Sequence, residues 1–168
     1  VLGELTGRLL QLSQCPRLSI REMALSALSS TAAAAEGHFA PYANNVVGVL
    51  AQLLQLVEER FWTVRGRALE CLGHVAIAVG KDLFMPYLTV GMAAAEQTLQ
   101  MTDAQELLEY TYPFFGVVAK VIGADFTPYL ATLCPHLIGV IGRSDYTAHD
   151  VSSLRACLLY TSDAADEG

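Results

Sequence analysis

The sequence predicts an all-α fold, a right-handed α-α solenoid in which two-helix repeats stack into a superhelix. A short motif recurs three times at a period typical of helical repeat proteins. The segments on either side of each copy carry apolar residues at helical spacing. Hydrophobic residues make up 53% of the chain and charged residues only 16%, a balance typical of chains that fold.

The recurring motif predicts a corner between two helices. Its prolines, Pro41, Pro86 and Pro128, lie 45 and then 42 residues apart, and helical repeats of this kind are about 40–47 residues long. A phenylalanine stands two positions before each proline and a tyrosine follows it, which gives the corner residues Phe39, Pro41, Tyr42, Phe84, Pro86, Tyr87, Phe126, Pro128 and Tyr129. We expect the three corners to line up along one edge of the stack.

A glycine precedes each corner by a few residues. We expect Gly37, Gly80 and Gly123 to take the left-handed conformation that closes a helix. The corner proline has a φ angle suited to the first turn of the next helix, and the phenylalanine can fill the space under the turn. Each corner therefore separates the second helix of one repeat from the first helix of the next.

The second helix of a repeat precedes the glycine. Residues 20–28 and 64–72 match at an offset of 44. In the second copy the polar stripe Arg67, Glu70 and His74 is predicted to face outward. The opposite face is apolar at helical spacing and is predicted to be core, through Val64, Ala68, Cys71, Leu72, Val75 and Val79.

The first helix of a repeat follows the corner, over residues 43–58, 88–100 and 130–142. These segments are apolar on more than one face, as expected of a helix that is buried on two sides. Pro113 lies inside the second helix of the third helix pair and is predicted to kink or end it.

The periodicity divides the chain into a helical array and two further segments. The array is a helix pair at 1–37, full repeats at 38–80 and 81–123, and an opening helix at 124–143. A polar loop is expected at 144–156. Residues 157–168 read CLLYTSDAADEG and resemble a translated transposase sequencing adapter, so we expect them to be an artefact. We expect both ends of the chain to be truncations.

Composition argues against several classes of function. The formal net charge of −7 gives no electrostatic footprint for nucleic acid or anionic lipid, and basic protein partners fit it better. Residues 37–57 carry no charge but include Pro41, Asn44 and Asn45, which favour a buried helix over insertion in a membrane.

The sequence also lacks the patterns of catalytic and cofactor sites. Its four cysteines stand singly, and its histidines have no partner at metal-ligand spacing. The glycines do not form a phosphate-binding loop. We expect no metal, no cofactor and no enzymatic activity.

Val64-Arg65 followed by Ala-x-x-x-Leu is the HEAT pattern. The stretch from Val64 to Leu72, continued by residues 78–85, resembles a mid-chain segment of the importin-β superfamily, specifically its importin 4 and importin 5 branch. The similarity extends from about residue 20 to 142. The third helix pair departs from the pattern, because Leu107-Leu108 stands in place of Val-Arg.

The resemblance implies a carrier that moves between cytoplasm and nucleus. Such a carrier binds protein cargo with basic import signals, ribosomal proteins or histones. It passes the nuclear pore through contacts with Phe-Gly nucleoporins and releases cargo when Ran-GTP binds, at a site that would lie mainly outside this segment. The alternative hypothesis is a HEAT-repeat scaffold that organises an enzyme or a cytoskeletal complex.

Five polar residues are candidates, three for contact with cargo and two for a structural role. Arg67, Glu70 and His74 could contact cargo, since second helices line the concave side of such solenoids. The alternative for this stripe is an ordinary solvated helix face. Arg21 and Arg65 are predicted to be structural, bonding loop carbonyls or an acidic neighbour between repeats.

Overall fold

The computed structural model describes residues 1–101 and 103–141, and every regular element in these ranges is helical. Seven α-helices are joined by loops and by four short 3-10 helices, labelled η. In chain order they are α1 (Leu2–Leu12), α2 (Leu18–Ala35), η1 (Glu36–Phe39), α3 (Ala40–Leu54), η2 (Glu59–Phe61), α4 (Trp62–Phe84), η3 (Met85–Tyr87), α5 (Leu88–Leu99), α6 (Gln105–Ile122), η4 (Gly123–Phe126) and α7 (Thr127–Ile141). The predicted polar loop and the adapter-like segment lie outside the described residues.

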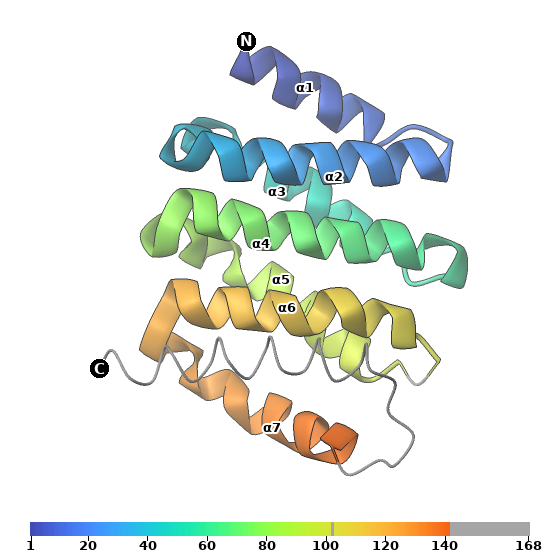
Figure 1. Ribbon diagram of the computed structural model, residues 1–168, viewed down its shortest axis with the longest axis vertical. Helices are drawn as coiled ribbons and strands as arrows, with labels where there is room; N and C mark the ends of the chain where they lie inside the picture. Colours follow the sequence, from blue (N-terminus) through green and yellow to red (C-terminus); the bar gives the residue numbers. More distant parts are fainter. Residues whose placement is uncertain (102, 142–168) are drawn as a thin grey trace.

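The helices stack in two layers. Figure 1 shows α2, α4 and α6 running side by side in front, with α3 and α5 behind them. Helix α4 packs against α2 on one side and α6 on the other. We call the outer surface of α2, α4 and α6 the second-helix face. This arrangement is the predicted all-α repeat fold.

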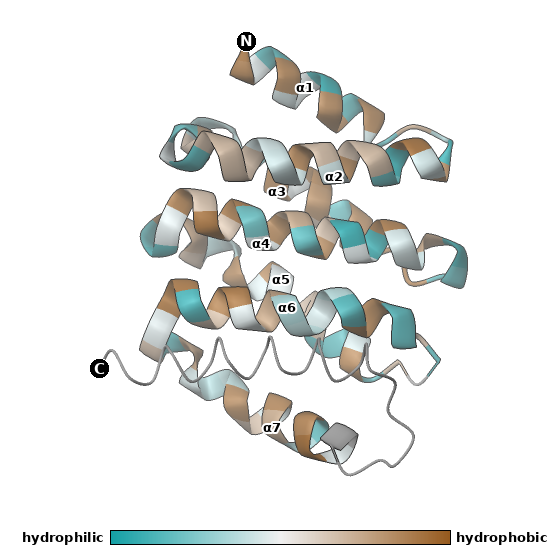
Figure 2. Ribbon diagram, in the orientation of Figure 1, coloured by the Kyte–Doolittle hydropathy of each residue, from teal (hydrophilic) through white to brown (hydrophobic). Residues whose placement is uncertain are grey.

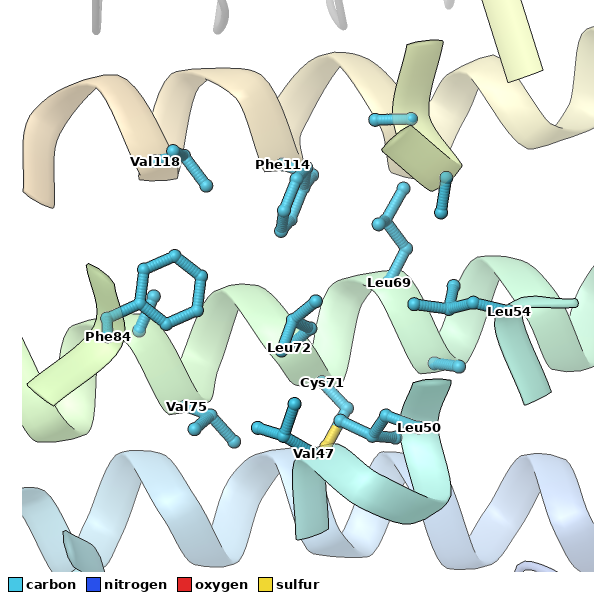
Figure 3. Close-up of a cluster of buried hydrophobic side chains, with 14 of the residues drawn as sticks. Val47, Leu50, Leu54, Leu69, Cys71, Leu72, Val75, Phe84, Phe114 and Val118 are labelled. Atoms are coloured by element: carbon cyan, nitrogen blue, oxygen red, sulfur yellow. The ribbon is translucent and has the colours of Figure 1, made fainter. Parts of the chain in front are cut away.

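One apolar core runs through the stack. All five of Val64, Ala68, Cys71, Leu72 and Val75 on the predicted core face of α4 are fully buried, and Val79 is partly buried. Figure 3 shows Leu72 and Phe84 on one side and Phe114 and Val118 on the other, filling the space between α4 and α6. Figure 2 shows hydrophobic and hydrophilic residues alternating along the second helices, as expected of helices that bury one side.

The three corners lie at the same edge of the stack, where the second helices end (Figure 1). Phe39, Phe84 and Phe126 are buried there, with at most 4% of each side chain exposed. An ion pair of 2.9 Å between Lys81 Nζ and Asp125 Oδ2 joins the second corner to the third. The corners are thus structural units that repeat with the helix pairs.

The prediction for Gly37 was wrong. Gly80 and Gly123 have positive φ angles, of 75° and 61°, but at the first corner Glu36 takes the positive φ, 48°. Glu36 stands three residues before Phe39, as Gly123 stands three before Phe126. Their ψ angles also agree, at −138° and −130°. Gly80 stands four residues before Phe84, so the left-handed residue lies three or four positions before the buried phenylalanine, whereas Gly37 stands only two before Phe39.

We predict that Glu36→Gly stabilises the protein by about 1 kcal/mol, because glycine adopts this backbone conformation without the strain that a side chain brings. The free energy of unfolding in urea measures the effect. Gly37→Ala is the matched control: its backbone is not left-handed and its Cβ would meet nothing within 4 Å, so only a small change is expected. A loss of stability in Glu36→Gly would contradict the assignment of strain.

Pro113 does not end its helix, since α6 continues from Gln105 to Ile122. A proline inside a helix costs about 3 kcal/mol, largely through a lost hydrogen bond. The flanking Tyr112, Phe114 and Phe115 are all buried, and packing of these rings in the stack offsets that cost. Local sequence preference is overridden here by tertiary burial.

Two stretches, Glu59–Leu99 and Gln105–Gly139, are long and apolar enough to pass a test for membrane-spanning helices, each with a mean hydropathy of 1.3. The first contains α4 and α5, and the second contains α6 and most of α7. Core helices of soluble proteins pass the same test. Of the two windows, 39% and 28% are buried, and the buried part includes core residues such as Leu72 and Val118.

Candidate protein-binding surface

The predicted stripe on α4 lies on the second-helix face. Arg67, Glu70 and His74 are each partly exposed there. Gly80 and Gly123 are 43 residues apart, and this offset gives the equivalent positions of α6 as Tyr110, Pro113 and Val117, which are also partly exposed. Neighbouring second helices therefore present equivalent positions side by side.

Arg67 is held by two groups. Its Nη1 donates a hydrogen bond of 2.9 Å to Glu70 Oε2, one helical turn along. Its Cζ lies 5.4 Å from the centre of the Tyr110 ring, within the range of a cation–π contact. The hydrogen bond to Glu70 raises the pKa of Arg67, and the charge of Glu22 on α2 acts in the same direction. Arg67 therefore sits where α2, α4 and α6 meet.

His74 is tied to the neighbouring helix. Its Nδ1 lies 2.7 Å from Ser29 Oγ on α2 and 3.1 Å from the carbonyl oxygen of Glu70. Since Ser29 is only 4% exposed, this contact fixes the imidazole ring at the junction of α2 and α4. His74 can still line the surface through the rest of its ring, because the residue is partly exposed.

A groove of about 140 Å³ lies between α4 and α6. Glu70 and Glu109 bring carboxylates to it, one from each helix. Their negative charge, which Arg67 offsets in part through its ion pair with Glu70, favours a cation. The remaining lining is largely apolar and includes Gly73, His74, Tyr110, Pro113, Phe114 and Val117. A long side chain with an apolar stem and a positive head matches this chemistry.

Tyr110 reaches the groove because Gly66 leaves room for it. A Cβ at Gly66 would lie 2.3 Å from Tyr110 Cδ2 and 2.7 Å from its Cε2, closer than carbon atoms approach. The ring therefore packs directly on the backbone of α4. Burial raises the pKa of the Tyr110 hydroxyl, so the side chain is neutral near pH 7.

Arg65 is buried in the seam between repeats rather than exposed to a partner. Its Nη1 donates to the carbonyl oxygen of Leu54, and its Nη2 donates to the Ala94 carbonyl at 3.0 Å and to Gln97 Oε1 at 2.9 Å. Burial lowers the pKa of its guanidinium. These bonds join the ends of α3 and α5 to the start of α4.

Arg21 occupies the equivalent position in the preceding helix pair. Its Nε donates to the carbonyl oxygen of Cys15, in the loop between α1 and α2. In both repeats the arginine thus ties the second helix to the chain that leads into it. The third helix pair has Leu108 at this position and lacks the tie.

Glu109 and Tyr110, which α6 contributes to the groove, were not among the residues predicted from the sequence. The spacing of 43 between Gly80 and Gly123 was the available signal, because it relates Arg67 to Tyr110. Among the residues that the structure describes, no group of three His, Cys, Asp or Glu could hold a metal ion.

These features define an α-helical solenoid with a groove of apolar and acidic lining between two of its second helices. A model of the family described as "Importin subunit beta-1-like, TPR repeats" matches residues 9–114. The probable importin subunit beta-4 of Schizosaccharomyces pombe is 31% identical over 138 residues, which cover 82% of this chain and 13% of that protein.

Solved structures agree with the sequence comparison. The crystal structure of Kap121p superposes with a TM-score of 0.76 and 26% identity, over 85% of this chain and 14% of that one. Kap121p bound to Pho4p gives a TM-score of 0.75 and 25% identity, over 85% and 13%. The chain belongs to the importin-β family, and it spans about 13% of the length of the relatives it matches.

Proposed function

We propose that the chain is the part of a nuclear transport receptor that holds a basic segment of a protein cargo on its second-helix face. The groove between α4 and α6 carries this proposal, because it joins an apolar lining to carboxylates on both helices. A lysine side chain would lay its stem along Pro113 and Val117 and bring its ammonium group near Glu70 and Glu109.

The family supports the wider role. In a solved structure, Kap121p has a protein, Pho4p, bound to it. We propose that the receptor carries ribosomal proteins, histones or other cargo with basic import signals between cytoplasm and nucleus. It contacts Phe-Gly nucleoporins on the way, and Ran-GTP releases the cargo by binding mainly outside this segment. No covalent bond is made or broken in this proposed cycle, so binding free energy alone drives it.

The groove is tested by the affinity for a labelled lysine-rich peptide, measured by fluorescence anisotropy. We expect the double variant Glu70→Gln with Glu109→Gln to bind roughly five- to tenfold more weakly, since each lost partly exposed ion pair contributes about 0.2–1 kcal/mol. The difference should shrink in high salt, where exposed charges are screened.

Glu4→Gln combined with Glu59→Gln is the matched control. It also removes two negative charges, from exposed residues in α1 and η2 that are not among the residues lining the groove. An equal loss of affinity in the control would show that net charge, and not the groove, attracts the peptide. Equal binding of the lysine-rich peptide and a version with glutamine at every lysine would overturn the proposed basic ligand.

A second experiment tests the transport cycle. The full-length receptor is immobilised, loaded with histone or ribosomal protein and treated with Ran-GTP. Release of the cargo is the expected result. Retention would favour the alternative, a repeat scaffold that holds its partner permanently.

A further inference from the structure

We propose that Arg67 is a tethered competitor for cargo, which occupies one acidic wall of the groove in the free protein and is displaced by an incoming lysine. This inference rests on the proposed function, because it needs a cationic ligand between α4 and α6. It gives Arg67 the role of setting the affinity, in place of the direct contact with cargo that the sequence suggested.

The Glu70 carboxylate is already engaged in the free protein. Its Oε2 already accepts a hydrogen bond of 2.9 Å from Arg67, and the two side chains are 34% and 36% exposed. A carboxylate that holds a guanidinium attracts a second cation less strongly, because the positive charge of the first opposes it. A cargo lysine that engages Glu70 must therefore weaken this internal ion pair.

The aromatic ring of Tyr110 supports the Arg67 side chain. The Tyr110 ring lies 5.4 Å from its Cζ, and that ring sits where only glycine at position 66 permits it. Glu22 on α2 further favours the charged guanidinium. Contacts from α4 and α6 thus hold the side chain beside the groove, so its position does not depend on one exposed ion pair alone.

Displacement of Arg67 from Glu70 is reversible and costs little free energy. Partly exposed ion pairs of this kind are weak, and Arg67 has solvent on its outer side, since it is partly exposed. When the lysine leaves, the tethered guanidinium returns at a high effective concentration because it is on the same helix as Glu70. Arg67 therefore lowers the affinity for weakly basic segments and leaves the groove accessible to strongly basic ones.

The test is the affinity of the Arg67→Gln variant for the labelled lysine-rich peptide, measured with the complete 168-residue chain. We expect binding about two- to fivefold tighter than that of the parent, the factor that corresponds to one partly exposed ion pair. Arg60→Gln is the control, because Arg60 pairs with Glu58 at 2.9 Å in the separate α3–α4 connection. The control removes the same charge and should change the affinity by much less.

A double-mutant cycle separates competition from general charge. In the Glu70→Gln background, Arg67→Gln should no longer tighten binding, because the carboxylate for which the two cations compete is gone. Equal tightening with and without Glu70 would overturn the competition. Weaker or unchanged binding of Arg67→Gln alone would overturn it as well, and weaker binding would assign Arg67 a direct contact with the peptide.

The two proposals fail in different ways. If the parent chain binds the lysine-rich peptide no better than the glutamine version, the basic ligand itself is wrong. If the parent discriminates between the peptides and loses affinity in the Glu70 and Glu109 double variant, the groove stands. The behaviour of Arg67→Gln then decides the competitor role alone.

Discussion

Replacing Phe84 with alanine is expected to lower the free energy of unfolding by about 3–5 kcal/mol, the range found for buried phenylalanine. Phe84 is 0% exposed, and Figure 3 places its ring between α4 and α6 with Val118 and Phe114 nearby. Alanine would leave a cavity at the corner between two repeats. Since whole domains are stable by only about 5–15 kcal/mol, this one change removes a large share of the stability. Unfolding in guanidinium, followed by circular dichroism, measures the loss.

The adjacent Leu83 provides the control for this experiment. It lies at the same corner but is 53% exposed, so Leu83→Ala removes little buried area and should cost no more than about 0.5 kcal/mol. Equal losses in the two variants would mean that the corner phenylalanine does not hold the repeats together. A broadened transition in Phe84→Ala alone would indicate that the repeats on either side unfold separately, as expected when one interface of a repeat array is weakened.

The corners show what the sequence could predict. The phenylalanine, proline and tyrosine recur together, and the need to turn the chain and fill the space under the turn explains each of them. The period and the apolar spacing of residues 64–79 were sufficient to predict the stacked helix pairs, because burial on one side leaves a regular pattern. These parts of the fold follow from local rules repeated along the chain.

Glu36 and Pro113 show where local rules fail. Glycine preference placed the left-handed residue at Gly37, but it lies at Glu36, three residues before the buried Phe39. Proline preference predicted a kink or an end at Pro113, yet α6 runs on to Ile122, with buried rings on either side of the proline. In both cases packing between helices decides against a preference of about 1–3 kcal/mol, and packing cannot be read from one helix alone.

The groove illustrates the same limit for the site. The stripe of Arg67, Glu70 and His74 was selected from the sequence, but its chemistry depends on α6. The Tyr110 ring approaches the stripe because Gly66 leaves room for it, and Glu109 lines the same groove. A pattern within one helix cannot show which residue of the next helix lies opposite, unless the repeat offset is applied to the functional stripe as well as to the core.

Gly91→Ala should destabilise the protein by about 1–3 kcal/mol, the usual cost of forcing extra atoms into a packed core. A Cβ at Gly91 would lie 2.5 Å from Phe114 Cζ and 2.8 Å from Leu72 Cδ2. Both neighbours are buried and face other helices, so neither can move aside without opening a gap elsewhere. The clash outweighs the gain of about 1 kcal/mol that alanine otherwise brings to a helix. Unfolding in urea gives the difference in free energy.

Gly48→Ala makes the same chemical change in α3 with the opposite expectation. A Cβ there would meet nothing within 4 Å, and Gly48 is an exposed residue inside a helix. Only the helix preference remains, so this variant should be more stable by about 1 kcal/mol. Opposite signs at the two glycines would show that α5 approaches α4 and α6 as closely as a glycine allows. Stabilisation at both would mean that the contact between α5 and these helices is looser than the structure gives, and that the stack tolerates movement at this seam.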